Sequence, residues 1–175
     1  MNKEEIIRWA QRYETSDSEW SSNCEKEIGL RIRTNSFITK RDLEEVINWK
    51  FQSMQFRKKH FLSFLDNIDE ESLKNDSGLA FDESNEINKV NCFLKFKGIG
   101  VSLTSVILTF YEPKSYGVFD IHVWRELFGK EPKIFYKLDN YLRLLEGLRT
   151  ISKTYDLDVR YIEKALFQKN LEESK

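Results

Sequence analysis

"FKGIGVSLTSVILTFYEPKSYGVFDIHVWREL", residues 96–127, combines a glycine turn, an apolar segment and a cluster of charged residues. Gly98 and Gly100, two of the seven glycines of the chain, are separated by one residue. Glycine adopts backbone angles that other residues avoid, so this spacing predicts a tight turn. We expect one helix to end before the turn and another to begin at Val101 or Ser102.

The start of the second helix is a candidate phosphate-binding site. Its first backbone N–H groups have no partner within the helix and carry the positive end of the helix dipole. The glycines have no side chains to keep a phosphate away, and Lys95 and Lys97 lie just before the glycine turn in the sequence. A plain corner between two helices, with a glycine as the C-cap, fits the two glycines as well.

An acid follows at the end of the same stretch. The apolar segment leads into a loop that contains Pro113 and Gly117, and the loop ends at Asp120, 20 residues after Gly100. Asp120 directly precedes "IHVWRELF", where an aspartate is also a good N-cap for a helix.

This order of hairpin, apolar helix, loop and acid resembles the helix-hairpin-helix (HhH-GPD) superfamily of DNA glycosylases. The family hairpin reads Leu-Pro-Gly-(Val/Ile)-Gly-x-x-x-Ala, and "DIHVWREL" is similar to the family's Asp-x-His-hydrophobic-x-Arg. The hairpin positions are occupied here by Phe96 in place of Leu, Lys97 in place of Pro, Gly98, Ile99 and Gly100 as the Gly-x-Gly, and Thr104 in place of Ala. Lys97 and Thr104 depart from the pattern. The resemblance covers about residues 90–129, and elsewhere only the helical character is shared.

The resemblance implies a role for each matching residue. Asp120 would be the catalytic carboxylate that stabilises a sugar cation and orients the attacking water. Ser102 occupies the position where strand-cutting members carry a lysine, which implies a monofunctional enzyme. The DNA backbone would be held by Lys97, Gly98, Ile99, Gly100, Val101, Ser102 and Thr104.

Cofactor sites are not indicated. Many members of the superfamily hold an iron–sulfur cluster on four cysteines, whereas this chain has only Cys24 and Cys92. The two cysteines and two histidines are too scattered for a zinc site. We therefore expect neither a cofactor nor a metal.

The base pocket is harder to place. "INWKF", residues 47–51, lies in a stretch that mixes aromatic and basic residues, which suits stacking on bases and contact with phosphates. Trp49 is a candidate for stacking on an extruded base, and Lys50 or Arg57 for holding phosphate. His122 is a candidate contact to phosphate or substrate. Ordinary core packing for Trp49, and a packed or surface position for His122, are the alternatives.

Composition and periodicity predict an all-α protein. Hydrophobic residues make up 40% and charged residues 33% of the 175 residues, with a net charge of −1, which is typical of a globular chain. The dominant hydrophobic period is helical, and we expect nine or ten short helices. Ser18 is a candidate N-cap, and Thr39 with Asp42 is close to a capping box. "KNDSGLAFDESN", residues 74–85, is the clearest predicted loop.

We expect one helix-hairpin-helix glycosylase-like domain over residues 1–175, with helical lobes at about 1–80 and 85–175 and a cleft between them. No apolar run is long enough to span a membrane, and the N-terminus lacks the apolar core of a signal peptide. With only two cysteines, the chain fits a reduced cytoplasmic setting, associated with the nucleoid.

The expected function is removal of a damaged or modified base from double-stranded DNA by a monomeric enzyme, in repair or in defence against modified foreign DNA. One alternative is a non-catalytic helix-hairpin-helix DNA-binding module in which Asp120 only caps a helix. Another is a protein-interaction domain, which the mildly acidic net charge also fits.

Overall fold

A computed structural model describes residues 1–174, and within that range every regular element is a helix. The prediction of an all-α protein is confirmed. The ten α-helices of the described residues are α1 (Lys3–Ser16), α2 (Glu19–Asn35), α3 (Lys40–Lys50), α4 (Gln55–Leu62), α5 (Glu70–Asp82), α6 (Glu86–Leu94), α7 (Val101–Tyr111), α8 (Ile121–Phe128), α9 (Leu138–Tyr155) and α10 (Val159–Glu173). A short 3₁₀ turn, η1, covers Leu65–Asn67. No helix of the described residues is both long and apolar enough to cross a membrane.

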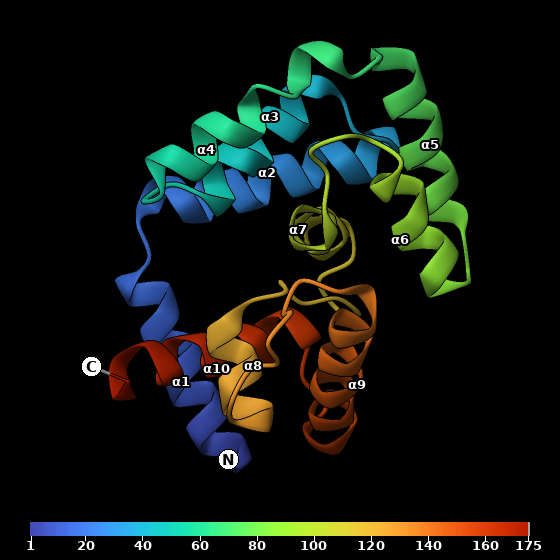
Figure 1. Ribbon diagram of the computed structural model, residues 1–175. Coiled ribbons are helices and arrows are strands. Elements are labelled where there is room, and N and C mark those ends of the chain that lie inside the picture. Colours follow the sequence, from blue (N-terminus) through green and yellow to red (C-terminus); the bar gives the residue numbers. More distant parts are fainter. Residues whose placement is uncertain (175) are drawn as a thin grey trace.

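The helices form two groups with α7 between them (Figure 1). On one side α2 packs against α3, α3 against α4, and α5 against α6. On the other side α10 packs against α1, α8 and α9. The first helix therefore lies beside the last one, although it belongs to the first of the two segments predicted from the sequence. Helix α7 contacts α2, α3, α6 and α9, so it is the central element.

Local capping signals explain several helix starts. Ser18 accepts a hydrogen bond from the backbone N–H of Ser21 and caps α2. Thr39 and Asp42 bond reciprocally, each side chain accepting from the other residue's backbone N–H, and form a capping box at the start of α3. Both caps were predicted from the sequence, and both are confirmed.

The predicted loop at residues 74–85 is wrong, because most of it lies in α5. Asp69 caps this helix through the backbone N–H of Ser72, and the buried side chains of Leu73, Ala80 and Phe81 hold its inner face in the core. Small and polar residues that favour turns in isolation are therefore kept helical by packing.

The predicted glycine turn is present between α6 and α7. Gly98 has a φ of +94°, a conformation that other residues rarely adopt. A Cβ atom at this position would lie 2.6 Å from the ring of Phe64, so the close approach also requires glycine. Gly100 has an ordinary φ of −95° and is the N-cap of α7.

The loop after α7 is tied to two helices. The backbone N–H of Phe119 donates to the hydroxyl of Ser105 on α7 at 2.9 Å. The backbone N–H of Arg160, at the start of α10, donates to the carbonyl of Pro113 at 2.9 Å. Phe119 is completely buried. These contacts fix the backbone that carries the next residue, Asp120.

Candidate active site

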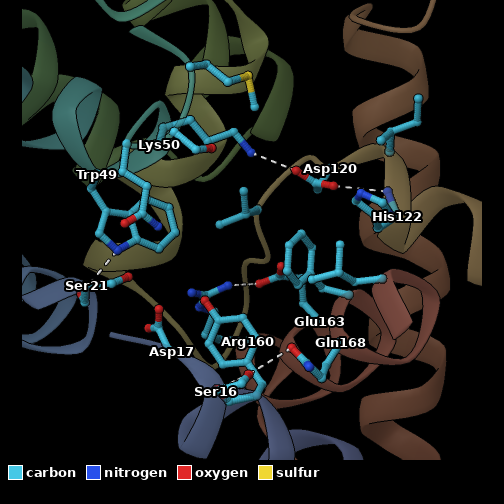
Figure 2. Close-up of a pocket in the computed structure, with 18 of the residues that line it drawn as sticks. Ser16, Asp17, Ser21, Trp49, Lys50, Asp120, His122, Arg160, Glu163 and Gln168 are labelled. Carbon is cyan, nitrogen blue, oxygen red and sulfur yellow. Dashed lines mark hydrogen bonds and ion pairs between the residues drawn. The ribbon is translucent and has the colours of Figure 1, made fainter. Parts of the chain in front are cut away.

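A cavity of about 620 Å³ lies between the two groups of helices (Figure 2). Its lining comes from α1, α2, α3, α4, α8 and α10 and from the loops that precede α8 and α9. A cavity of this size can bury most of a small organic molecule. The lining side chains that bear on its chemistry are Tyr13, Asp17, Ser21, Trp49, Lys50, Arg57, Asp120, His122, Arg160, Glu163 and Gln168.

Asp120 lies on the wall of this cavity, as the residue between the loop and α8. One carboxylate oxygen, Oδ1, accepts a hydrogen bond from the backbone N–H of His122 at 3.0 Å, so Asp120 is the N-cap of α8. The other, Oδ2, accepts from the Lys50 ammonium at 3.1 Å. The side chain of Asp120 is 21% exposed, which leaves part of the carboxylate open to the cavity.

Two opposing influences act on the pKa of Asp120. Burial is the largest and would raise the pKa of the carboxyl group. The Lys50 ammonium and the backbone N–H of His122 favour the charged form, and together they outweigh the burial and lower the pKa. Asp120 is therefore a carboxylate at neutral pH.

Lys50 reaches Asp120 from the opposite wall, where it is the last residue of α3. Figure 2 shows the ammonium pointing at the carboxylate. The Lys50 side chain is only 9% exposed, and its partner lies 70 residues away in the sequence. The sequence suggested a phosphate contact for Lys50, and the structure instead places its amine inside the cavity beside the candidate catalytic acid.

Trp49 both lines the cavity and belongs to the core. Its Nε1–H donates to the backbone carbonyl of Ser21 at 3.2 Å, and its ring meets that of Phe110 edge-on at a centroid distance of 4.9 Å. The guanidinium of Arg160 lies 5.5 Å from the Trp49 ring centroid. The ring is fixed by these contacts and is 8% exposed.

The other two pocket candidates lie at different depths. Arg57, near the start of α4, is exposed and lines the outer part of the cavity. His122 also lines the cavity, but its Nδ1 is 2.9 Å from the side-chain oxygen of Asn170 and its ring packs edge-on against Phe167. Its position is set by α10.

A buried ionic network, which the sequence did not reveal, forms the floor of the cavity. The Arg160 guanidinium bonds to Glu163 on its own helix and to Glu25 on α2, with a distance of 2.7 Å from Nη2 to Glu25. Burial alone would raise the pKa of Glu25, but Arg160, followed by Lys164, lowers that pKa to about 2. For Glu163 burial is stronger than the pairing with Arg160 and raises the pKa. Glu and Arg at these positions look like surface residues in the sequence, because only the tertiary structure buries them and brings Arg160 of α10 to Glu25 of α2.

Ser21 is another lining residue without a signal in the sequence. Its side chain is 1% exposed, and its hydroxyl has no hydrogen-bond partner among the described residues. A buried hydroxyl without a partner is costly, so this group is available to a molecule that enters the cavity.

The hairpin forms a separate surface beside the cavity. The side chains of Ile99, Val101 and Thr104 are buried, so these residues can contact a partner only through the backbone. Gly100 offers no side chain to cap α7, which leaves the first N–H groups of that helix without a capping partner. Lys97 is exposed, with its amine 5.6 Å from the centroid of the Phe64 ring.

No group of three or more His, Cys, Asp or Glu residues in the described chain is arranged to hold a metal ion. No family model, no curated protein and no solved structure matches this chain. The function must therefore be inferred from the residues and the geometry.

Proposed function

We propose that this chain is a two-lobed helix-hairpin-helix DNA glycosylase that hydrolyses the N-glycosidic bond of a damaged or modified base in double-stranded DNA. The observation that carries the proposal is the place of Asp120: an ionised carboxylate on the wall of a cavity of about 620 Å³, at the end of the loop that follows the glycine hairpin. The two groups of helices are then the lobes, and the cavity is the base pocket.

The chemistry needs a negative charge near the sugar, because breaking the bond between base and deoxyribose leaves a sugar cation. Asp120 is ionised and cannot move freely, since one oxygen accepts from His122 and the other from Lys50. A carboxylate has about four acceptor sites, so these two bonds leave capacity for the attacking water. A fixed charge of this kind stabilises a transition state without reorganisation.

The pocket offers both aromatic and polar groups to an extruded base. Tyr13, Trp49 and Phe135 contribute aromatic lining, and the Ser21 hydroxyl is available as a hydrogen-bond donor or acceptor. Bases that have been flipped out of a duplex are held by stacking and by hydrogen bonds of this kind. The volume of the cavity admits a base with an added group, so damaged and bulky modified bases both fit the proposal.

The rims of the cavity also suit DNA. Phe56 is 88% exposed and precedes the lining residue Arg57, while Ile134 on the other rim is 61% exposed and precedes the lining residue Phe135. Exposed apolar side chains can enter the gap that an extruded base leaves in the stack. The N–H groups at the start of α7 and the amine of Lys97 would hold phosphates beside the pocket.

The test uses the protein and its Asp120→Asn variant on DNAs of varied origin, including chemically damaged and phage-modified DNA. Released bases are identified by mass spectrometry, and abasic sites by their sensitivity to alkali. We expect base release by the wild type and a loss of about 100- to 10,000-fold in the variant. Asparagine caps helices as well as aspartate does, so α8 should persist.

Asp69→Asn is the matched control. Asp69 caps α5 by accepting from the backbone N–H of Ser72, as Asp120 caps α8, but it does not line the cavity. The control should release base at the wild-type rate. Equal release by the Asp120→Asn variant and the wild type would contradict a catalytic role for Asp120.

A non-catalytic DNA-binding module is the second candidate, because the bond from His122 to Asp120 is by itself a complete N-cap. It predicts no base release from any DNA, together with binding that weakens steeply as salt rises. The exposed rim, with Phe56 at 88%, favours a protein-interaction domain as the third candidate. That candidate predicts no affinity for DNA even at low salt.

A further inference from the structure

The pair formed by Lys50 and Asp120 has a chemical capacity beyond hydrolysis. Lys50 is the one lysine among the described residues that line the cavity. Its amine nitrogen lies 3.1 Å from the Asp120 carboxylate. For Asp120 to act on the sugar, the carbon C1′ must lie beside the same carboxylate, and therefore near the amine. A lysine amine at this place can react with a carbonyl carbon.

We propose that Lys50 forms an imine with the abasic sugar left after base removal, and that the protein then cuts the DNA strand on the 3′ side of that sugar. The inference rests on the proposed glycosylase function. It adds a lyase step and assigns that step to a residue on α3, on the wall of the cavity opposite Asp120.

The hairpin itself has no lysine at the corresponding place. Ser102 stands there, and its backbone carbonyl accepts a hydrogen bond from the Ser105 hydroxyl within α7. Ser102 is not among the described residues that line the cavity. A lyase step in this protein therefore needs an amine from another element, and Lys50 is placed to supply it.

The burial of Lys50 suits this role better than a role in phosphate binding. Its side chain is 9% exposed, and its ammonium points at Asp120 (Figure 2). A lysine on the rim would move freely, whereas the ion pair holds Nζ in one place beside the carboxylate. Positioning of a nucleophile in this way contributes strongly to rate.

The reaction balances without any oxidant or reductant. Nζ of the Lys50 ammonium forms a bond to C1′ of the ring-opened aldehyde, and two of its three hydrogens pass to the aldehyde oxygen, which leaves as water, so that a protonated imine remains. A proton then leaves C2′ for water, and the C3′–O3′ bond breaks to release the downstream strand with a 5′-phosphate. Water finally cleaves the imine, which frees Lys50 and an unsaturated aldehyde.

The experiment uses a duplex with a single abasic site, so the identity of the excised base is not needed. The protein is incubated with this DNA in the presence of borohydride, which reduces an imine to a stable amine and leaves a covalent adduct. Adduct and strand cleavage are measured on denaturing gels, and the linked residue is identified by peptide mapping. Binding to the same duplex is measured in parallel.

Lys50→Arg is the decisive variant, because arginine keeps the positive charge beside Asp120 but cannot form the imine. Lys50→Gln is a second variant in case the larger arginine perturbs the cavity. Lys153→Arg is the control, since Lys153 is exposed on α9 and does not line the cavity. We expect the adduct with the wild type and with Lys153→Arg, mapped to Lys50, and loss of adduct and cleavage in both Lys50 variants.

The outcomes separate this inference from the proposed function. An adduct that survives in both Lys50 variants would overturn it, because another amine would then be the nucleophile. A wild type that releases base but gives no adduct would overturn the lyase step and leave the glycosylase standing. A protein that neither binds the abasic duplex nor releases any base would overturn both.

Discussion

The two walls of the cavity differ in how their functional residues are held. On one wall Asp120 is placed mainly by bonds close in the chain, from the backbone N–H two residues later and through Phe119 to the Ser105 hydroxyl 14 residues earlier, and the Lys50 ammonium adds one long-range bond. On the other wall Trp49 is fixed by the carbonyl of Ser21, 28 residues away, and by the ring of Phe110 on α7. Lys50 follows Trp49 as the last residue of the same helix.

The difference explains why the sequence predicted Asp120 at a helix start, whereas it named Lys50 only as a phosphate contact and did not predict its bond to Asp120. The cap, the turn and the loop that place Asp120 lie within one continuous stretch, and each has its own residue signal. Lys50 looks like any helix-terminal lysine until α2, α3 and α7 are packed together. If the two walls are supported in these different ways, substitutions in the floor, in the hairpin and behind Lys50 should differ in their effect on stability.

The largest loss of stability should come from a substitution in the buried ionic network at the floor of the cavity. Glu25 on α2 and Arg160 on α10 form a buried pair, and Glu25→Gln would leave the arginine with less compensating charge. Loss of one partner of such a pair costs about 3–5 kcal/mol. We expect a decrease of that order in the free energy of unfolding, measured by denaturant titration. A change below about 1 kcal/mol, as for an exposed pair, would show that the walls are not joined there.

The same pair has a pH dependence with a definite sign. The folded-state pKa of Glu25 is lowered from 4.5 to about 2, so its contribution to stability is complete above pH 4.5 and is lost as the pH falls toward 2. Wild-type stability should fall over this interval, and the Glu25→Gln variant should fall less. Equal acid sensitivity of the two proteins would contradict the assigned pairing.

The hairpin between α6 and α7 should show an effect on stability that depends on position. Gly98→Ala forces a side chain into a conformation with φ of +94° and against Phe64, at an expected cost of about 1–3 kcal/mol. Gly100→Ala is the control, since nothing lies within 4 Å of its Cβ position and its φ is ordinary. Thermal unfolding should separate the two variants. Equal stability of the two variants would mean that neither the positive φ of Gly98 nor its close approach to Phe64 constrains this position.

The smallest loss of stability should come from the contact between Ser21 and Trp49, the residue before Lys50. Trp49→Phe removes the bond from Nε1–H to the Ser21 carbonyl while keeping most of the ring packing, and should cost about 1 kcal/mol. Trp20→Phe is the control, because Trp20 is 47% exposed. Denaturant titration of the two variants gives the difference. If the Trp20 variant were the less stable one, the proposed support of this wall would be wrong.

Part of the fold followed from local rules. The hydrophobic period indicated helices, and Ser18, Thr39 with Asp42, and Asp120 marked helix starts because a short polar side chain bonds the free N–H groups there. The glycine turn was also predictable from local sequence, because glycine adopts a positive φ that other residues avoid. Residues 74–85 failed as a predicted loop because burial of Leu73 and Phe81, and not local preference, decides that segment.

By itself, the sequence determined the helical class, the glycine turn and the acid placed at a helix start, because each depends on contacts between residues close in the chain. Only the tertiary structure decided that Lys50 meets Asp120, that Arg160 meets Glu25 and that Ser21 faces a cavity without a partner. These contacts join residues 70 and 135 positions apart, or depend on which surface is buried. Burial and long-range charge pairing are collective results of packing, and no single segment encodes them.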